Sequence, residues 1–372
     1  MEYSIATKNK GNKKSEIIRY IFEHKNASKT ELAKELGLSM PTVLQNTKEL
    51  LEKGMLVEAG EYESTGGRRA KTLAMNGKAA YSIGIDITSD HVGFVLLNFA
   101  GSLLQHTRVE KEFCNSLDYY RGLADDLERF IQKQNVNREQ ILGVGISISG
   151  IINNEEMIVI KSHELNLEGT SLMIMERFIP YPIHFENDAN AAMIAEQNQT
   201  EDDAIYLFIS DTVGGAIKNN GTLVHGKNRK AGEFGHVVIV PNGRSCYCGK
   251  QGCVNSYCSV RALESTSGLQ LEEFMKQVSQ KNPDALKIWD EYLDYLAITV
   301  TNIRMMYDLD IVLGGDVGEY LEPYMIELGE KVRKYNVLDK DTGYLKTSAY
   351  KSGSKAAGAA LYFIYQCIND IY

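Results

Sequence analysis

The order of helix starts and helix breaks between residues 15 and 52 constrains the fold more than any other feature of the sequence. An apolar stripe over residues 15–24 predicts a first helix. Ser28 and Glu31 have the spacing of a capping box, in which each side chain bonds a backbone amide left unpaired at a helix start. Gly37 then predicts the end of this short second helix, in the left-handed conformation.

A third helix is expected to start at Ser39, with Pro41 in its first turn, where no amide hydrogen is needed. Three helices in this order, with a glycine in the turn, are typical of a helix–turn–helix. The apolar positions of the third helix predict a buried face made of Val43, Leu44, Leu50 and Leu51. Its other face carries side chains able to bond base edges or phosphates, so the candidate DNA contacts are Ser39, Thr42, Gln45, Asn46 and Lys48.

The segment after the third helix predicts a β-hairpin. Residues 55–58 and 71–75 have the composition of strands, and a turn with two glycines lies between them. Arg68 and Arg69 follow that turn and are candidate contacts to phosphates or to a minor groove. We therefore expect residues 1–77 to form a winged helix–turn–helix that binds duplex DNA. A helical protein-docking module with a charged hairpin is the alternative.

The charge distribution agrees with a DNA-binding segment joined to an acidic body. Residues 1–77 hold 13 Lys and Arg against 10 Glu and no Asp, whereas the whole 372-residue chain carries a net charge of −9. No apolar run approaches the roughly 18 residues that cross a bilayer. The polar N-terminus also lacks the apolar block of a secretion signal, so we expect a cytoplasmic protein with no membrane partner.

The remainder of the chain repeats one pattern of strands and helices. Strands are predicted at residues 81–87 and 92–97, and the same plan recurs at residues 205–209 and 214–217. Helical patterns follow each block. This repetition predicts an α/β body of two lobes with a ligand cleft between them.

Three of the six cysteines lie within eight consecutive positions: Cys246, Cys248 and Cys253. Disulfides are rare in the cytosol, so such a cluster indicates a metal site. A group of buried free cysteines is the alternative. The other three cysteines, Cys114, Cys258 and Cys367, are expected to pack as small apolar residues.

The body resembles the ROK family of repressors and sugar kinases. The resemblance rests on His236 with the cysteine cluster, on Ala231-Gly232-Glu233-Phe234-Gly235, on the Glu186–Ala192 motif and on Ile311–Gly315; residues 64–69 resemble the wing of the repressor branch. It implies a winged helix–turn–helix fused to a two-lobed actin/hexokinase-like (ribonuclease H-like) ATPase fold of the α/β class. The DNA-binding domain would span residues 1–77 and the body residues 78–372, with a small lobe at about 78–186 that includes a C-terminal helix at about 356–372, and a large lobe at about 187–355.

This resemblance also implies the ligand sites. His236, Cys246, Cys248 and Cys253 would bind a structural zinc ion, since one imidazole and three thiolates complete a tetrahedral set. The implied sugar-binding residues are Asn187, Asp188, Glu233 and His236. Asn255 stands where the family usually has a glutamate, so the preferred sugar can differ or sugar binding can be lost. A loop or helix-cap role is the alternative for Asn187 and Asp188.

Three positions that face nucleotide in the kinases of this family lack the expected glycines. The sequence reads Ile-Thr-Ser-Asp after Asp86, Ser-Asp-Thr-Val at residues 210–213, and Asp316 in place of a third glycine. We therefore expect no catalysis, with Asp188 kept for sugar hydroxyls rather than used as the general base of phosphoryl transfer.

Together these patterns predict a sugar-responsive repressor of carbohydrate uptake or catabolism genes. A sugar bound between the lobes would alter its affinity for a duplex DNA operator. A homodimer or tetramer is expected because helix–turn–helix proteins usually bind paired half-sites. An ATP-dependent sugar kinase with a DNA-binding head, and a regulator that no longer senses sugar, are the alternatives.

Overall fold

The computed structural model describes residues 12–61, 71–197, 203–350 and 352–371. These residues divide into two compact units. The first unit contains the described residues up to 197 together with 353–371, and the second contains residues 203–350 and 352. Within these described ranges, every helix is too short or too polar to span a membrane.

The first unit begins with three helices and a small antiparallel sheet, here called the winged-helix domain. The helices are α1 (Lys13–His24), α2 (Lys29–Glu35) and α3 (Met40–Glu52); the strands β1 (Asn26–Ser28), β2 (Leu56–Glu61) and β3 (Lys71–Met75) pair in the order β1-β3-β2. The predicted start signals are confirmed, because Ser28 and Glu31 form both bonds of the capping box and the Ser39 side chain caps α3. Gly37 has a φ of 62° after α2. Strand β1 is an element that the sequence patterns did not predict.

One prediction for α3 is wrong. Leu44 is 47% exposed, whereas Val43, Thr47 and Leu50 are fully buried. Thr47 reaches the core because its hydroxyl donates to the Val43 carbonyl over 2.7 Å, so its polar group is satisfied within the helix. The inward face of α3 is therefore narrower than predicted, and Leu44 lies on the side that carries the candidate DNA contacts.

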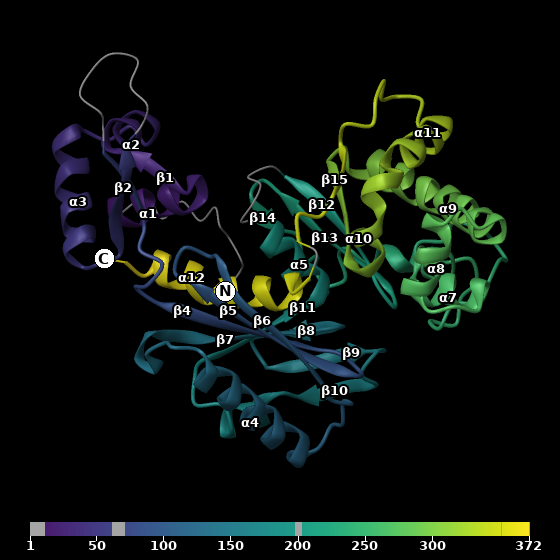
Figure 1. Ribbon diagram of the computed structural model, residues 1–372, viewed down its shortest axis with the longest axis horizontal. Coiled ribbons are helices and arrows are strands. Elements are labelled where there is room, and N and C mark those ends of the chain that lie inside the picture. Colours follow the sequence, from purple (N-terminus) through teal and green to yellow (C-terminus); the bar gives the residue numbers. More distant parts are fainter. Residues whose placement is uncertain (1–11, 62–70, 198–202, 351, 372) are drawn as a thin grey trace. The chain divides into compact units, whose positions relative to one another are not determined.

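A five-stranded sheet forms the middle of the first unit, in the order β11-β7-β4-β5-β6 (Figure 1). Its strands are β4 (Tyr81–Ile87), β5 (His91–Asn98), β6 (Leu103–Glu110), β7 (Ile141–Ile148) and β11 (Ile183–Asn187). Strands β4, β7 and β11 are parallel, which places their carboxyl ends at one edge of the sheet. Helix α4 (Leu117–Lys133) covers one face, and α12 (Ser354–Asn369) covers the other. A second small sheet contains β8 (Ile151–Asn153), β9 (Ile158–Ser162) and β10 (Leu167–Ser171).

Helix α12 packs closely against β4, β7 and α5 (Asp188–Gln197). The close approach is possible because glycines lie at the contact points, both in the neighbouring strands and in α12 itself. A Cβ atom added at Gly84 of β4 would lie 1.9 Å from the Ala356 carbonyl oxygen, and one added at Gly358 would lie 1.6 Å from the Ala191 carbonyl oxygen. Such distances are far below van der Waals contact, so only glycine fits at either position. The position of α12 is thus fixed on two sides by backbone contacts.

The second unit is built on a five-stranded sheet in the order β14-β13-β12-β15-β16. Its strands are β12 (Ala204–Ile209), β13 (Val213–Asn219), β14 (Thr222–Leu223), β15 (Asp310–Gly314) and β16 (Leu345–Thr347). Its helices are α6 (Asn255–Cys258), α7 (Val260–Ser267), α8 (Leu271–Ser279), α9 (Pro283–Tyr307), α10 (Gly315–Leu321) and α11 (Met325–Tyr335). Short 3-10 helices lie at Phe234–His236 and Glu322–Tyr324 in this unit, and at Arg138–Gln140 and Met173–Arg177 in the first unit.

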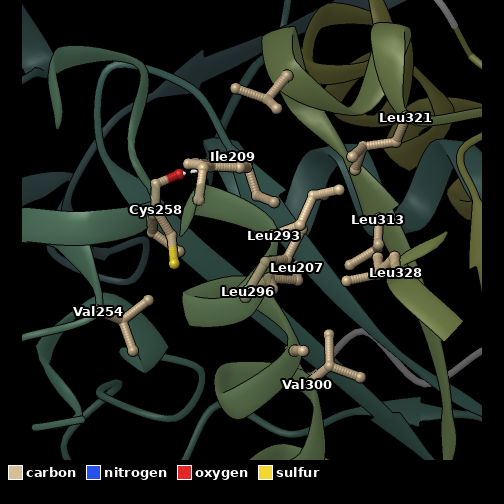
Figure 2. Packing of buried hydrophobic residues seen from close by; sticks show 14 of the residues in the cluster. Leu207, Ile209, Val254, Cys258, Leu293, Leu296, Val300, Leu313, Leu321 and Leu328 are labelled. Atoms are coloured by element: carbon tan, nitrogen blue, oxygen red, sulfur yellow. Dashed lines mark hydrogen bonds between the residues drawn. The ribbon is translucent and has the colours of Figure 1, made fainter. Parts of the chain in front are cut away.

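The core of the second unit lies where α9, α10 and α11 pack on the sheet. Figure 2 shows leucine and isoleucine side chains of β12 and β15 against those of the three helices. Cys258 is fully buried among them, as predicted. The same expectation is wrong for Cys114, which is exposed, and Cys367 is only partly buried.

Candidate functional site

Three carboxylates and one lysine of the first unit come together near the carboxyl edge of its parallel strands. Asp86 lies near the end of β4, and Asp188 follows β11 directly as the first residue of α5. Glu164 lies in the segment between β9 and β10, and Lys355 is the second residue of α12. These four residues are here called the carboxylate cluster. The carboxyl edge of parallel strands is where α/β folds usually bind ligands.

The cluster is held together by charge. The Nζ atom of Lys355 lies 2.8 Å from Oδ2 of Asp86, and the two side chains are only 20% and 10% exposed. Burial lowers the pKa of Lys355, but the charges of Asp86, Asp188 and Glu164 outweigh it and raise the pKa above its usual value. Burial raises the pKa of the Glu164 carboxyl, and the charge of Lys355 acts in the opposite direction.

The two predicted sugar-binding residues Asn187 and Asp188 make different kinds of contact. Asn187 accepts hydrogen bonds from the amides of Ala189 (3.0 Å) and Asn190 (3.1 Å), as a helix cap does, and donates to the Gly150 carbonyl over 2.9 Å. The Oδ1 atom of Asp188 accepts from the Ala189 amide over 2.9 Å. Asn187 therefore shapes the turn that places Asp188 in the carboxylate cluster.

The remaining predicted sugar-binding residues belong to the second unit. Glu233 is exposed and directly precedes the short helix that contains His236. Asn255 is buried at the start of α6, and its Oδ1 atom accepts a hydrogen bond from the Val213 amide over 2.8 Å. The side-chain oxygen of Asn255 thus holds the start of β13.

His236, Cys246, Cys248 and Cys253 form a group whose ligand atoms all lie within 4.8 Å of one another. The Sγ atoms of Cys248 and Cys253 are 3.8 Å apart, and the Sγ of Cys246 is 3.9 Å from Nδ1 of His236. Zinc–sulfur bonds of about 2.3 Å at tetrahedral angles place two sulfurs about 3.8 Å apart, so these residues fit a zinc-sized ion.

The backbone of this loop is folded by two glycines. Gly249 and Gly252 have φ values of 86° and 82°, which favour glycine. A Cβ atom at Gly252 would lie 1.8 Å from the Val240 carbonyl oxygen. The second ring nitrogen of His236 lies 3.3 Å from the hydroxyl of Tyr247. This contact can set which nitrogen of the ring is left to bind a metal.

The three carboxylates at the positions that lack the expected glycines have local partners. Asp90 bonds His91 over 2.8 Å, and Asp211 pairs with Arg261 over 2.9 Å. Asp316 accepts a hydrogen bond from Ser210. Each of the three positions thus carries a side chain held by a neighbouring residue, where a glycine would leave the backbone open to close approach.

The outward face of α3 presents the predicted DNA contacts. Asn46 donates to the Thr42 carbonyl over 2.7 Å, Gln45 donates to Glu49 over 3.3 Å, and Lys48 lies 3.8 Å from Glu52. The contacts of Gln45 and Lys48 are exposed and weak, so these side chains can exchange them for DNA groups at small cost, whereas the bond of Asn46 is partly buried. Arg68 and Arg69, the predicted wing contacts, lie outside the described residues.

Helix α12 joins the winged-helix domain to the carboxylate cluster. At its end, Ser15 donates to the Ile371 carbonyl over 3.1 Å and Arg19 donates to Asn369 over 2.6 Å. The rings of Phe22 and Tyr365 meet edge to face at 5.4 Å. Lys355 lies at the other end of α12. The sequence patterns missed this connection, and they missed Lys355 and Glu164. A lysine among small residues at a helix start was the one available signal.

Comparisons with known proteins agree with the division between winged helix and body. The model of the ROK family matches residues 82–365, and a model described as winged helix-turn-helix DNA-binding matches residues 12–57. The xylose repressor of Bacillus spizizenii is 30% identical over 317 residues, covering 80% of each chain. The N-acetylglucosamine repressor of Escherichia coli O157:H7 is 23% identical over 256 residues, covering 67% of this chain and 62% of the relative.

Two solved structures share the fold. A ROK family transcriptional regulator, described as a homolog of the E. coli MLC protein, has a TM-score of 0.77 at 20% identity and covers 96% of both chains. The ROK hexokinase from Thermus thermophilus has a TM-score of 0.63 at 24% identity, and the match covers 78% of this chain and all of the hexokinase. The regulator therefore shares the arrangement of nearly the whole chain, and the kinase shares only a part of it.

Proposed function

The chain belongs to the ROK family, and on this premise we propose that it is a DNA-binding transcriptional regulator whose affinity for its operator is altered by a bound sugar. Two relatives are named xylose repressor and N-acetylglucosamine repressor. These names support repression of carbohydrate uptake or catabolism genes. The observation that carries the proposal is the presence of a winged helix–turn–helix and a ROK body in one chain.

The chain is a regulator rather than a kinase. Residues 12–57 match a winged helix-turn-helix DNA-binding model and the curated relatives are named as repressors, whereas the ROK hexokinase covers only 78% of this chain. Phosphoryl transfer depends on phosphates held by closely approaching backbone, and the corresponding turns here carry side chains. Asp188 is accordingly assigned to binding sugar hydroxyls rather than to removing a proton from them.

The proposed sugar-binding residues are Asn187 and Asp188 of the first unit and Glu233, His236 and Asn255 of the second. Carboxylates and amides are the groups that bond vicinal hydroxyls. Asp188 is the strongest candidate because its turn is shaped by Asn187 and its charge acts on Glu164 and Lys355 of the carboxylate cluster. Glu233 is supported by its exposure beside the short helix of His236.

A structural zinc ion is proposed at His236, Cys246, Cys248 and Cys253. The separations of the sulfur atoms support it, and four protein ligands leave no position for a substrate. When bound, the ion would hold the loop in one conformation and so couple folding of the loop to the neighbouring Glu233.

The DNA contacts are proposed on α3 and in the wing, at Ser39, Thr42, Gln45, Asn46, Lys48, Arg68 and Arg69. A homodimer or tetramer is proposed because paired half-sites require paired recognition helices. The proposed domain bounds are residues 1–77 for the DNA-binding domain and 78–372 for the body. The cytoplasm is the proposed location, since that is where an operator and its inducer meet.

One experiment tests this function directly. The full chain is screened by thermal shift against a panel of sugars that includes D-xylose and N-acetylglucosamine, and DNA selected by the protein itself serves as operator. We expect one sugar to raise the Tm and to change operator affinity about 5- to 150-fold, the usual range of coupling between two sites. Asp188→Asn should lose both effects while binding DNA normally, and Asp118→Asn on the exposed face of α4 should keep them. If no sugar changes operator binding, sugar control is wrong.

A further inference from the structure

Lys355 stands at a position where a positive charge is unfavourable by itself. It is the second residue of α12, whose first turn begins after Gly353 with a φ of 72°. Backbone amides at a helix start point outward unpaired and give that end a partial positive charge. A lysine there is repelled by the helix that carries it and must be stabilised by other groups.

Those groups are the three carboxylates of the cluster. Asp86 is bonded to the ammonium over 2.8 Å, and Asp188 and Glu164 both raise the pKa of Lys355. Without the lysine, the three carboxylates would lose this ammonium group in a poorly hydrated region. The imidazole of His106 also interacts with Asp86, but burial lowers the pKa of His106 and so favours its neutral form. Such an arrangement is costly, and it would be relieved by taking up protons or by binding another cation.

Backbone contacts fix the start of α12, which carries Lys355, relative to β4 and α5, which carry Asp86 and Asp188. Ala356, next to Lys355, has its carbonyl oxygen against Gly84, which precedes Asp86 by two positions on β4. On the other side of the helix, Gly358 contacts the carbonyl of Ala191, which follows Asp188 in α5. The lysine therefore does not reach the cluster by a flexible side chain alone, because its helix is held against both neighbouring elements.

We propose that Lys355 is the built-in counter-ion of the sugar site: its ammonium occupies the cation position of the carboxylate cluster, excludes a divalent metal from it and positions Asp86 and Asp188. The part of this proposal that concerns sugar rests on the proposed function. Three carboxylates without the lysine are hard oxygen ligands of the kind that Mg²⁺ and Mn²⁺ prefer. With the lysine in place, the site binds its sugar without a metal or a nucleotide.

The first test does not involve sugar. The full zinc-loaded chain is titrated with Mn²⁺ and bound metal is counted by electron paramagnetic resonance. We expect Lys355→Met to bind one more Mn²⁺ per chain than the wild type, and Lys355→Arg to bind no more than the wild type. The double variant Lys355→Met with Asp86→Asn should lose the additional ion. Lys346→Met is the matched control, because it removes a lysine 2.6 Å from Asp310 in the other unit.

The second test uses the sugar identified by the panel. Lys355→Met should weaken sugar binding at least tenfold by calorimetry, Mn²⁺ should restore most of that affinity, and Lys355→Arg should keep it. Rescue by a metal ion is not expected for a lysine that only stabilises the helix. Circular dichroism checks the fold, and if Lys355→Met does not fold, Lys355→Gln takes its place, since its amide keeps a hydrogen bond to Asp86 without the charge.

The outcomes distinguish the role of Lys355 as a counter-ion from its role in positioning the sugar site. If the variant without the lysine charge binds no additional Mn²⁺, the counter-ion proposal is wrong whatever the sugar result. If it does bind Mn²⁺ but sugar affinity is unchanged, Lys355 does not position the sugar site and that part is overturned. If the wild type binds no sugar, the proposed function fails, and the Mn²⁺ titration still decides whether Lys355 occupies a cation position.

Discussion

Arg19 of the winged-helix domain donates a hydrogen bond from Nη2 to Oδ1 of Asn369, the last residue of α12, over 2.6 Å. Two further contacts accompany it, from Ser15 to the Ile371 carbonyl and between the rings of Phe22 and Tyr365. A change at the start of α12 thus has a direct physical route to the first helix of the winged-helix domain.

We expect Arg19→Ala to weaken sugar control more than stability. One partly exposed hydrogen bond contributes about 1 kcal/mol, so the Tm should fall by only a few degrees. The sugar-induced change in operator affinity should shrink severalfold, because the two parts of the first unit lose one of their connections. Operator titrations with and without sugar measure it. Arg121→Ala, which removes a 62% exposed arginine of α4, should leave the response intact. An unchanged response in Arg19→Ala would show that coupling does not pass through this bond.

Leu44 and Val43 are neighbours on α3 and should behave in opposite ways. Leu44 is 47% exposed, so Leu44→Ala should change the free energy of unfolding by less than about 0.5 kcal/mol. It should still lower operator affinity by about three- to tenfold, because an apolar side chain on a recognition helix can contact a thymine methyl. Val43 is fully buried, and Val43→Ala should cost about 1–3 kcal/mol. Urea unfolding and gel-shift titration separate the two. Normal DNA affinity in Leu44→Ala would remove Leu44 from the interface.

Removal of one thiolate should abolish the metal site. We expect about one zinc per chain in the wild type by mass spectrometry of the metal content. Cys253→Ser should retain much less, with a clearly lower Tm, because binding free energy of a structural ion is folding free energy. Cys114→Ser changes an exposed cysteine outside the group and is the control. Equal zinc content in both variants would refute the proposed ligand set.

Glu164 should make stability depend on pH. Burial raises the pKa of its carboxyl, so the folded state holds the proton more tightly than the unfolded state. Stability from this group is therefore present at pH values below its ordinary pKa, and it is lost as the pH rises through the raised value. Glu164→Gln should raise the Tm at pH 7 and have little effect near pH 4. Glu168→Gln changes a 79% exposed residue and should have no such pH-dependent effect. A Tm that falls at pH 7 but not near pH 4 would show instead that the ionised carboxylate of Glu164 stabilises the fold.

The features of this protein that could be predicted from the sequence depend on residues close to one another along the chain. The capping box of Ser28 and Glu31 and the zinc-type spacing of the cysteines involve a few positions along the chain, and the structure contains both arrangements. The three residues of β1 were too few to give a strand pattern. The pattern misplaces Leu44 because an apolar residue at the edge of a helical stripe can lie on the buried side or on the exposed side of that edge.

The cation of the carboxylate cluster could not be predicted in this way. Asp86 and Lys355 are brought together by the packing of α12 on β4, which depends on Gly84 and Ala356 and not on any local pattern. Asn187 caps α5, and the sequence predicts this role only as the alternative to sugar binding, because helix caps and sugar sites use the same amide chemistry.

The anchoring of the winged-helix domain by α12 has a consequence during protein synthesis. The ribosome makes α1 among the first residues and α12 only after the body, so the Ser15–Ile371 hydrogen bond joins groups 356 positions apart. Until α12 has emerged, the nascent chain carries a DNA-binding domain without its anchor. A message that ends before residue 354 would encode a protein fragment that can occupy operators but cannot respond to the inducer. Frameshifts late in the gene should therefore be dominant over the intact allele.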